Sequence, residues 1–127
     1  MDEREMLKLA GELLDAWNTQ EVERVVERYT EALVYRDPNT RGAVEGRAAF
    51  RRYLTKLFAA WKMHWALREA HLFHDQQGCA VLWHASFERE GRPGRVEIDG
   101  MDLVTVSDGQ IARNEVYFDR TPLAPLI

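Results

Sequence analysis

The amino-terminal half of the chain repeats apolar residues at the spacing of α-helices. From Asp2 to about Trp17 they recur every three or four positions, which predicts a helix with one buried face and with Asp2 as its N-cap. Asn18-Thr19 interrupts this pattern, and a second, shorter helix is expected from Thr19 to Tyr29. A third apolar stripe predicts a helix over about Arg47–Trp61.

Strand patterns separate and follow these helices. A short strand, about Ala32–Arg36, is expected to stop at Asp37-Pro38-Asn39, because proline cannot continue a ladder of hydrogen bonds. The next segment, Thr40–Glu45, is predicted to be a loop. Alternating apolar and polar residues then predict long strands over about His64–Phe73 and Cys79–Glu90.

The stretch Arg95–Asp119 predicts a hairpin of two more strands. Ser107-Asp108-Gly109 supplies its turn, because Asp-Gly tolerates the positive φ that a tight hairpin needs. Asp102 is the only charged residue on the apolar face of the first strand, and a buried carboxylate is costly unless it is paired, hydrogen-bonded or protonated. A bulge at Asp99-Gly100 would instead turn Asp102 towards solvent or a dimer interface. The full face, at a period of two, is Val96, Ile98, Gly100, Asp102, Val104 and Val106.

The predicted order is helix, helix, short strand, helix and then four antiparallel strands in a meander. This order indicates an α+β fold, in which a strongly curved, mostly antiparallel sheet wraps on three N-terminal helices. The concave side of such a sheet leaves an internal pocket, which is the default place for a small-molecule site. We expect a single domain over residues 1–127, with an extended arm after Asp119.

Composition and charge exclude several functional classes. The net charge of −4 and the lack of a basic run argue against a nucleic-acid partner. No apolar run approaches the ~18 residues of a membrane span, and the polar first residues do not resemble a signal peptide. The single cysteine, Cys79, excludes an intramolecular disulfide and fits a cytoplasmic location. The histidines show no metal-ligand spacing, so we expect no metal and no cofactor; they are His64, His71, His74 and His84.

Several motifs, in this order and with these gaps, resemble a known superfamily. They are Trp17-Asn18, Tyr35-Arg36-Asp37-Pro38, Gly46-Arg47-Ala48-Ala49-Phe50 and the stretch Asp102–Asp119. Nearly the whole chain resembles the nuclear-transport-factor-2-like (NTF2-like) superfamily, and within it the SnoaL-like polyketide cyclases and the ketosteroid isomerases. The resemblance implies a cone-shaped fold. It does not fix the chemistry, because the superfamily includes isomerases, cyclases, dehydratases, epoxide hydrolases and non-catalytic domains.

The resemblance also implies roles for three aspartates. Asp37 looks like the general base of ketosteroid isomerases, and Asp102 looks like the aspartic acid of their oxyanion hole. Asp119 looks like the acid/base aspartate of SnoaL-type cyclases. The sequence departs from the isomerases where Leu13 and Leu54 stand in place of two tyrosines. Simpler interpretations remain: Asp37 would cap its turn, and Asp119 would cap the tail or pair with an arginine.

Further residues are predicted to contact a substrate. The core and the pocket wall are one surface in this architecture, so aromatic residues on it are candidates, with Trp83 and Phe118 the best placed. Asn114 is a candidate for orienting the substrate, and His71 for a second acid or base. The predicted substrate-binding residues are Trp17, Tyr53, Trp83, Asn114, Phe118 and His71.

These residues predict a cofactor-free enzyme of isomerase or cyclase type that transfers protons on a small, largely apolar carbonyl compound. The alternatives are a non-catalytic binding or interaction domain, and a hydrolase like the epoxide hydrolases of this fold. A homodimer is also expected, because the outer face of the last strands is apolar. The expected face consists of Met101, Leu103, Ile111 and Tyr117, with Glu97, Thr105, Arg113 and Glu115 as its rim.

Overall fold

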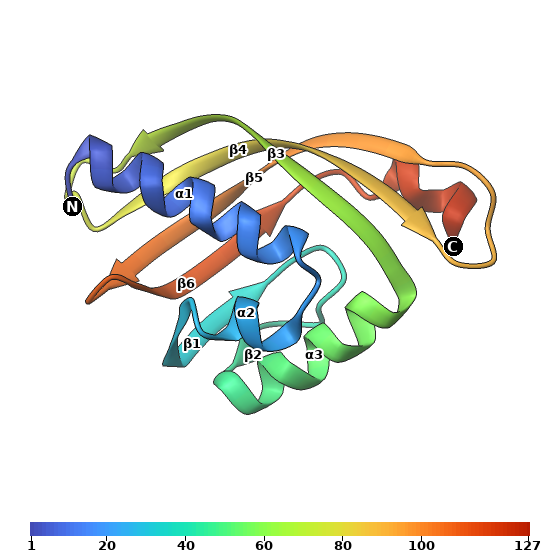
Figure 1. Cartoon of the computed structure of the whole chain (residues 1–127), viewed down its shortest axis with the longest axis horizontal. Helices are drawn as coiled ribbons and strands as arrows, with labels where there is room; N and C mark the ends of the chain where they lie inside the picture. The colour runs from blue at the N-terminus through green and yellow to red at the C-terminus, as the bar shows by residue number, and fades with distance from the viewer.

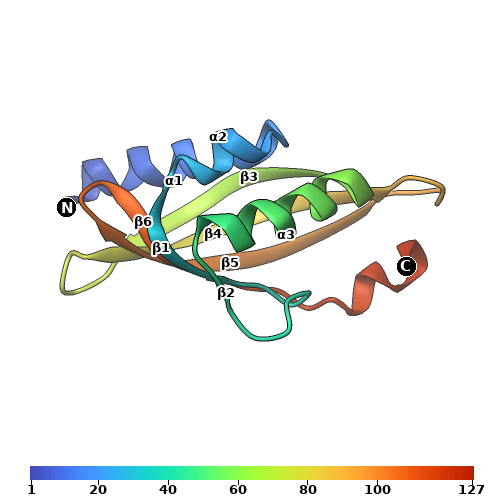
Figure 2. The same cartoon turned by 90° about the horizontal axis from the view of Figure 1, so that it is seen from below.

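The computed structural model describes all 127 residues and has the α+β architecture that the sequence predicts. Six strands form one sheet in the order β2-β1-β6-β5-β4-β3, and the helices α1, α2 and α3 lie on one of its faces (Figures 1 and 2). The helices are α1 (Glu3–Asn18), α2 (Val22–Val26), α3 (Arg47–Ala60) and the 3-10 helix η1 (Thr121–Leu126). The strands are β1 (Tyr29–Arg36), β2 (Val44–Glu45), β3 (Trp61–Leu72), β4 (Gly78–Arg89), β5 (Val96–Ser107) and β6 (Gln110–Tyr117).

The last four strands form the predicted antiparallel meander, and their register fixes which side chains face the helices. Trp83 of β4 pairs with Gly100 of β5, and the pairing runs without a shift from Gly78 to Phe87. There is therefore no bulge in β5 at Gly100, and the side chain of Asp102 points to the same inner face as the apolar residues two positions away. Its side chain is 6% exposed.

The first strand starts earlier than predicted. The second helix ends at Val26, and Tyr29 begins β1 instead of closing that helix. Tyr29 pairs with Ile111 in a parallel ladder between β1 and β6, a contact between segments far apart in sequence. A local pattern of apolar residues contains no information about a strand partner so distant in sequence. The prediction that the second helix continues to Tyr29 was therefore wrong. The predicted loop Thr40–Glu45 also ends in the short strand β2, which pairs with β1.

The carboxyl-terminal segment is not the extended arm that was predicted. It forms η1, whose Leu123 and Leu126 are each 1% exposed and which contacts β4 and β5. Two apolar side chains three positions apart lie on one side of a 3-10 helix, so a single turn buries both.

The β3 edge of the sheet is covered by two amide side chains, one from the end of α1 and one from the turn after it. Asn18 donates to the Trp65 carbonyl (2.9 Å) and accepts from the Trp65 N–H (2.7 Å). Gln20 donates to the Trp61 carbonyl (2.9 Å) and accepts from the Met63 N–H (2.6 Å). Because β3 is an edge strand, these amides pair backbone groups that would otherwise be free to bind another chain.

We expect Asn18→Ala to lower the free energy of unfolding by about 1–2 kcal/mol, because two hydrogen bonds to the edge strand are lost. Asn18→Asp keeps the acceptor for the Trp65 N–H but places a carboxylate oxygen against the Trp65 carbonyl oxygen, so it should also be less stable than the unchanged protein at pH 7. Urea unfolding monitored by tryptophan fluorescence measures both variants. Equal stabilities for Asn18→Ala and the unchanged protein would contradict this role.

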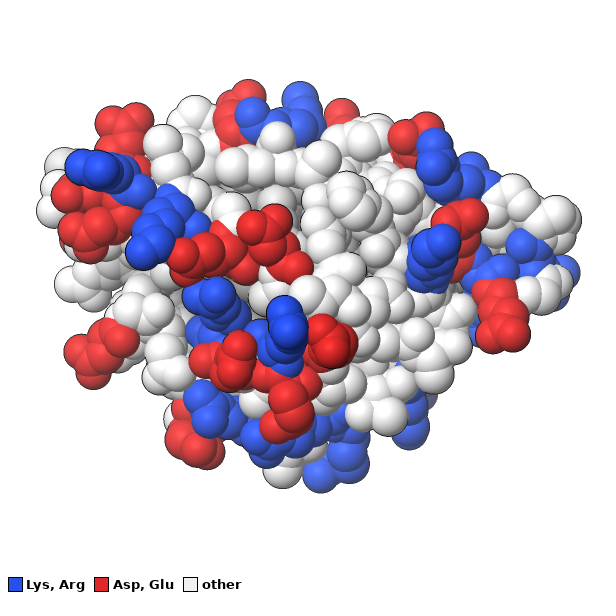
Figure 3. Space-filling model, in the orientation of Figure 1, with Lys and Arg blue, Asp and Glu red and all other residues white.

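Charged side chains gather over the left and lower parts and along the right side of the face seen in Figure 3, and an uncharged area lies between them. None of the helices is long and apolar enough to cross a membrane.

Candidate functional site

An apolar cavity lies between the helices and the concave face of the sheet. It measures about 450 Å³ when its opening to solvent is included, and nine of its twelve lining residues are hydrophobic. Two carboxyl groups, those of Asp37 and Asp102, enter this apolar surface. The lining residues are Leu14, Trp17, Tyr35, Asp37, Asn39, Leu57, Met63, Trp65, Phe87, Asp102, Val116 and Phe118. An apolar hollow with a few convergent polar groups has the general character of a small-molecule site.

Asp102 reaches the cavity from the middle of β5. Its Oδ1 accepts a hydrogen bond from the indole N–H of Trp83 (2.9 Å), which lies on the neighbouring strand β4. Burial raises the pKa of Asp102 to about 6, although hydrogen bonding from Trp83 and Asn114 opposes this rise, and the charge of Asp37 adds to it. At pH near 6 this carboxyl group is therefore present both as a proton donor and as a proton acceptor.

Asp37 reaches the cavity from the loop after β1 and is held by four donors. Its Oδ2 accepts from the hydroxyl groups of Tyr35 (2.7 Å) and Tyr53. Its Oδ1 accepts from the backbone N–H groups of Asn39 (2.7 Å) and Thr40 (3.1 Å). Two of these bonds cap the local turn and two come from aromatic side chains beside the cavity. Asp37 therefore caps its turn and lines the cavity at the same time, so the two interpretations of this residue do not exclude each other.

The other predicted residues divide into three groups around these carboxyls. Trp17 and Phe118 line the cavity itself. Trp83 and Asn114 are both 0% exposed, do not line the cavity and lie behind Asp102. Tyr53 acts through its hydrogen bond to Asp37.

Two predicted residues lie away from the cavity. Asp119 is exposed, and its carboxylate accepts from the backbone N–H of Thr121 (2.9 Å) at the start of η1. Hydrogen bonding from the Thr121 side chain, and then from its backbone, lowers the pKa of Asp119. His71 is exposed on β3, where its Nε2 is 2.7 Å from a carboxylate oxygen of Glu69. The structure therefore brings Asp37 and Asp102 to one cavity and places Asp119 and His71 elsewhere.

Sequence reasoning missed part of the wall. Tyr35, next but one to Asp37, is 2% exposed and stacks on Trp17 with ring centroids 5.8 Å apart. Tyr35 lies two positions after the apolar Leu33 on the same strand, and this spacing could have indicated that both side chains face inwards. Leu14 lines the cavity, whereas Leu13, predicted to stand at the isomerase tyrosine position, is buried beside it without lining the cavity. Trp65 also lines the cavity.

A glycine makes room for the Trp83 indole. A Cβ atom at Gly100 would lie 2.5 Å from the Trp83 ring and 2.8 Å from the Tyr117 carbonyl oxygen. Such distances are too short for any side chain, so the indole occupies the space above Gly100. From there its N–H group reaches Asp102, two residues further along the same face of β5.

We expect Gly100→Ala to lower the free energy of unfolding by about 1–3 kcal/mol, because the added methyl group overpacks a filled site. Gly109→Ala gives a contrast, since nothing lies within 4 Å of its Cβ position and only its φ of +78° is unfavourable. Thermal unfolding followed by circular dichroism measures both. If Gly100→Ala is as stable as the unchanged protein, the contact between Trp83 and Gly100 is looser than described.

The outer face of the sheet needs one correction. Ile111 was assigned to that face, but it is 2% exposed and belongs to the hydrophobic core. The pairing of β5 with β6 shifts between Thr105 and Val106, so Val106 pairs with Ile111 while Thr105 pairs with Arg113. This bulge places an extra residue, Ala112, in β6 and returns Ile111 to the inner face.

Comparison with known proteins agrees with this architecture. The model of the SnoaL-like domain family matches residues 10–114. No curated protein sequence matched the chain. Among solved structures, the epoxide hydrolase/cyclase-like enzyme SalBIII, described for pyran ring formation in the polyether salinomycin, is 27% identical, with a TM-score of 0.83 and 95% of each chain covered.

Two more distant structures share the fold with a small molecule bound. A protein with a ketosteroid isomerase-like fold from Catenulispora acidiphila DSM 44928, in complex with trimethylamine, is 14% identical (TM-score 0.82; 93% of this chain and 91% of that chain). TerC, co-crystallised with polyporic acid, is 17% identical (TM-score 0.81; 96% and 97%). The family match spans most of the sequence, and the chain belongs to the SnoaL-like domain family of the NTF2-like superfamily.

Proposed function

We propose that this protein is a cofactor-free enzyme that transfers protons on a small, largely apolar carbonyl compound, as an isomerase or a cyclase. One observation carries the proposal: Asp37 and Asp102 line a single apolar cavity but have different surroundings. Asp37 accepts four hydrogen bonds, which suits a carboxylate, while Asp102 is buried and binds a proton more readily. Unequal environments of this kind separate a base from an acid.

In the proposed reaction the carboxylate of Asp37 takes a proton from the carbon next to the substrate carbonyl. The electrons of that C–H bond form the enolate, and protonated Asp102 donates a hydrogen bond or its proton to the carbonyl oxygen. Returning the proton from Asp37 to a different carbon completes an isomerisation. In a cyclisation the enolate carbon attacks a second carbonyl as its C=O π bond opens, and the alkoxide so formed takes the proton from Asp37. Oδ1 of Asp102 already accepts from Trp83, so Oδ2 is the oxygen that would carry the proton.

The cavity wall favours a flat, apolar substrate. Trp17 and Trp65 meet edge to face with centroids 5.5 Å apart, and Phe87 and Phe118 lie 5.7 Å apart. Aromatic walls of this kind pack against rings or conjugated chains and exclude water from the carboxyls. The proposed substrate therefore has one or two oxygen atoms on an otherwise apolar skeleton.

Hydrogen exchange tests proton transfer without knowledge of the natural product. Small cyclic enones and β-diketones in D₂O are incubated with the protein, and deuterium incorporation next to the carbonyl is followed by proton NMR. Exchange above the buffer rate that is lost in Asp37→Asn supports the proposal. An exchange rate that is the same in Asp37→Asn would remove Asp37 as the base. Ligand binding without exchange across the whole set would favour the non-catalytic alternative.

A second candidate reaction is ring closure on an epoxide. The observation that favours it is the 27% identity to the epoxide hydrolase/cyclase-like SalBIII over 95% of both chains. The same two carboxyls would serve: Asp102 would protonate the epoxide oxygen as its C–O bond breaks, and Asp37 would take the proton from an attacking hydroxyl group. Products of an epoxy alcohol distinguish the reactions, because a cyclic ether indicates cyclisation and a diol indicates hydrolysis.

We also propose that the protein forms a homodimer through the outer face of the sheet and works in the cytoplasm. Met101 and Leu103 on that face are half-buried, and Tyr117 is 50% exposed. These side chains form an apolar patch of the kind that a second copy would cover. Light scattering should give twice the mass of the 14.8 kDa chain at micromolar concentration, and a monomer mass would exclude the dimer.

A further inference from the structure

A buried chain of hydrogen bonds runs from α1 to Asn114, which lies diagonally across the pair of strands β5 and β6 from Asp102. The indole N–H of Trp17 donates to the Tyr29 hydroxyl oxygen (3.1 Å), and that hydroxyl group donates to Oδ1 of Asn114 (2.7 Å). Tyr29 and Asn114 are both 0% exposed, and neither lines the cavity. Neither residue can therefore contact a substrate in the cavity, although Asn114 neighbours the carboxyl group of Asp102, which lines it.

The direction of each hydrogen bond in this chain is determined. An indole N–H group can only donate, so the Tyr29 oxygen accepts from Trp17 and its own proton points to Asn114. The Asn114 amide then has its Oδ1 towards Tyr29 and its Nδ2 towards the Leu103 carbonyl (3.5 Å) and the carboxyl of Asp102. A flipped amide would place Oδ1 beside those acceptors and would leave the Tyr29 proton without a partner.

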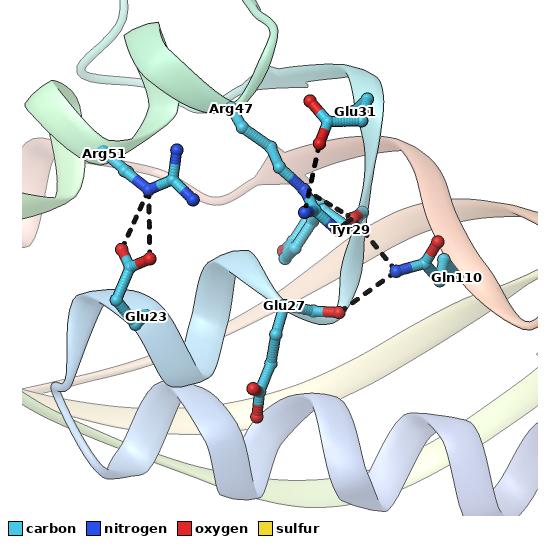
Figure 4. A network of polar contacts seen from close by, with 7 residues as sticks. All are labelled: Glu23, Glu27, Tyr29, Glu31, Arg47, Arg51 and Gln110. Atoms are coloured by element: carbon cyan, nitrogen blue, oxygen red, sulfur yellow. Dashed lines mark hydrogen bonds and ion pairs between the residues drawn. The ribbon is translucent and has the colours of Figure 1, made fainter.

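Tyr29 itself is held firmly in place. The guanidinium group of Arg47 donates to its backbone carbonyl (2.6 Å and 3.2 Å), and the side-chain amide of Gln110 approaches the same oxygen (3.4 Å) (Figure 4). Its ring packs edge to face on Phe50, with centroids 4.7 Å apart. Anchored at both its backbone and its ring, the side chain presents the hydroxyl group to Asn114 from a fixed position.

We propose that Tyr29 is a positioning residue for Asp102 that acts through Asn114. Its hydroxyl group holds the Asn114 amide with the N–H groups towards the carboxyl, and so sets how readily Asp102 keeps its proton. The use of that proton rests on the proposed function, whereas the hydrogen-bond chain does not. The other titratable groups that face Asp102 are Asp37, from the loop after β1, and the Cys79 thiol of β4.

Tyr29→Phe removes the hydroxyl group and keeps the ring against Phe50. Without that donor the Asn114 amide is free to turn, and the carboxylate of Asp102 loses a hydrogen bond that favours its charged form. We expect Asp102 to bind its proton about tenfold more tightly, which corresponds to a pKa about one higher. Carbon-13 NMR of carboxyl-labelled aspartate in the ligand-free protein measures this, with Asp102→Asn assigning the signal. Tyr117→Phe makes the same chemical change on the outer face and should leave the titration of Asp102 unchanged.

An unchanged Asp102 titration in Tyr29→Phe overturns the proposal. If Tyr29→Phe does not fold, the side-chain NH₂ signals of Asn114 in the unchanged protein decide the question. They should shift with the same midpoint as the Asp102 carboxyl, and signals that do not respond to that titration also overturn the proposal. None of these measurements uses a substrate, so a failure of the proposed enzyme activity would be seen separately.

Discussion

Asp37→Asn is expected to lower kcat on a competent enone by at least about 100-fold, because general base catalysis contributes about 10²–10⁴-fold and an amide cannot take the proton. Steady-state kinetics at pH 6 measure the change. Asn at this position still has one oxygen to accept from Tyr35 or from the backbone, so the turn retains part of its support. KM should change much less than kcat, since the same apolar wall binds the substrate.

The exposed Asp15 of α1 provides the matched control. Asp15→Asn makes the same substitution on the outer side of the helix and should keep full activity. The role of Asp102 is separable by pH: if its protonated form donates to the substrate, kcat decreases as pH rises through about 6. That dependence should be missing in Asp102→Asn. A variant at Asp37 that keeps more than half of the kcat would refute the assignment of the base.

Asp102→Asn should become more stable relative to the unchanged protein as pH rises, by about 3 kcal/mol in total. The pKa of Asp102 is raised from 3.8 to about 6 in the folded protein, mainly by burial. The folded state therefore binds this proton more tightly than the unfolded chain does. Its contribution to stability is fully present below the unfolded pKa and is lost as pH rises through the folded pKa. Asparagine has no such proton, so it avoids the loss.

Urea unfolding of both proteins between about pH 4 and about pH 8 measures this difference, in which the other titrating groups cancel. Asp119→Asn is a control of opposite sign. Because hydrogen bonding to Thr121 lowers the pKa of Asp119, its contribution is present at neutral pH and is lost as pH falls. A constant difference between Asp102→Asn and the unchanged protein would mean that Asp102 is solvated and ordinary in the folded state.

The two predictions lead to a common expectation about Asp102. A buried carboxyl at the wall of an apolar cavity lowers stability at neutral pH and at the same time provides a proton donor. Gains in stability on removing such a group are typical of functional sites. If Asp102→Asn is both more stable at neutral pH and less active, the Asp102 side chain is responsible for both the lower stability and the activity of the unchanged protein.

Periodicity predicted the elements whose partners are their chain neighbours. The stripe of α1 and the meander from β3 to β6 are local patterns, since a helix buries every third or fourth residue and a hairpin pairs adjacent segments. The unexpected parts involve distant partners. Tyr29 is a strand residue because β6 lies beside it, and Leu123 is buried because the ends of β4 and β5 meet it.

The same division applies to the site. The alternation along β5 was sufficient to identify Asp102 as a buried carboxyl, because a strand without a bulge fixes which face each residue occupies. No pattern in the sequence could decide that Asp37 reaches the same cavity while Asp119 does not, since both follow a strand and precede a proline or a turn. The loop after β1 brings Asp37 to the cavity, whereas Asp119 is exposed and accepts a hydrogen bond from the Thr121 N–H.

The sequence by itself determined the fold class and the inward face of the hairpin, because both follow from the local period of apolar residues. Only the tertiary structure decided which polar groups meet. The chain from Trp17 through Tyr29 to Asn114 joins α1, β1 and β6, and it reaches Asp102 on β5. Four elements must pack before every member of this chain has its partner, so the environment that sets the proton affinity of Asp102 exists only in the folded molecule.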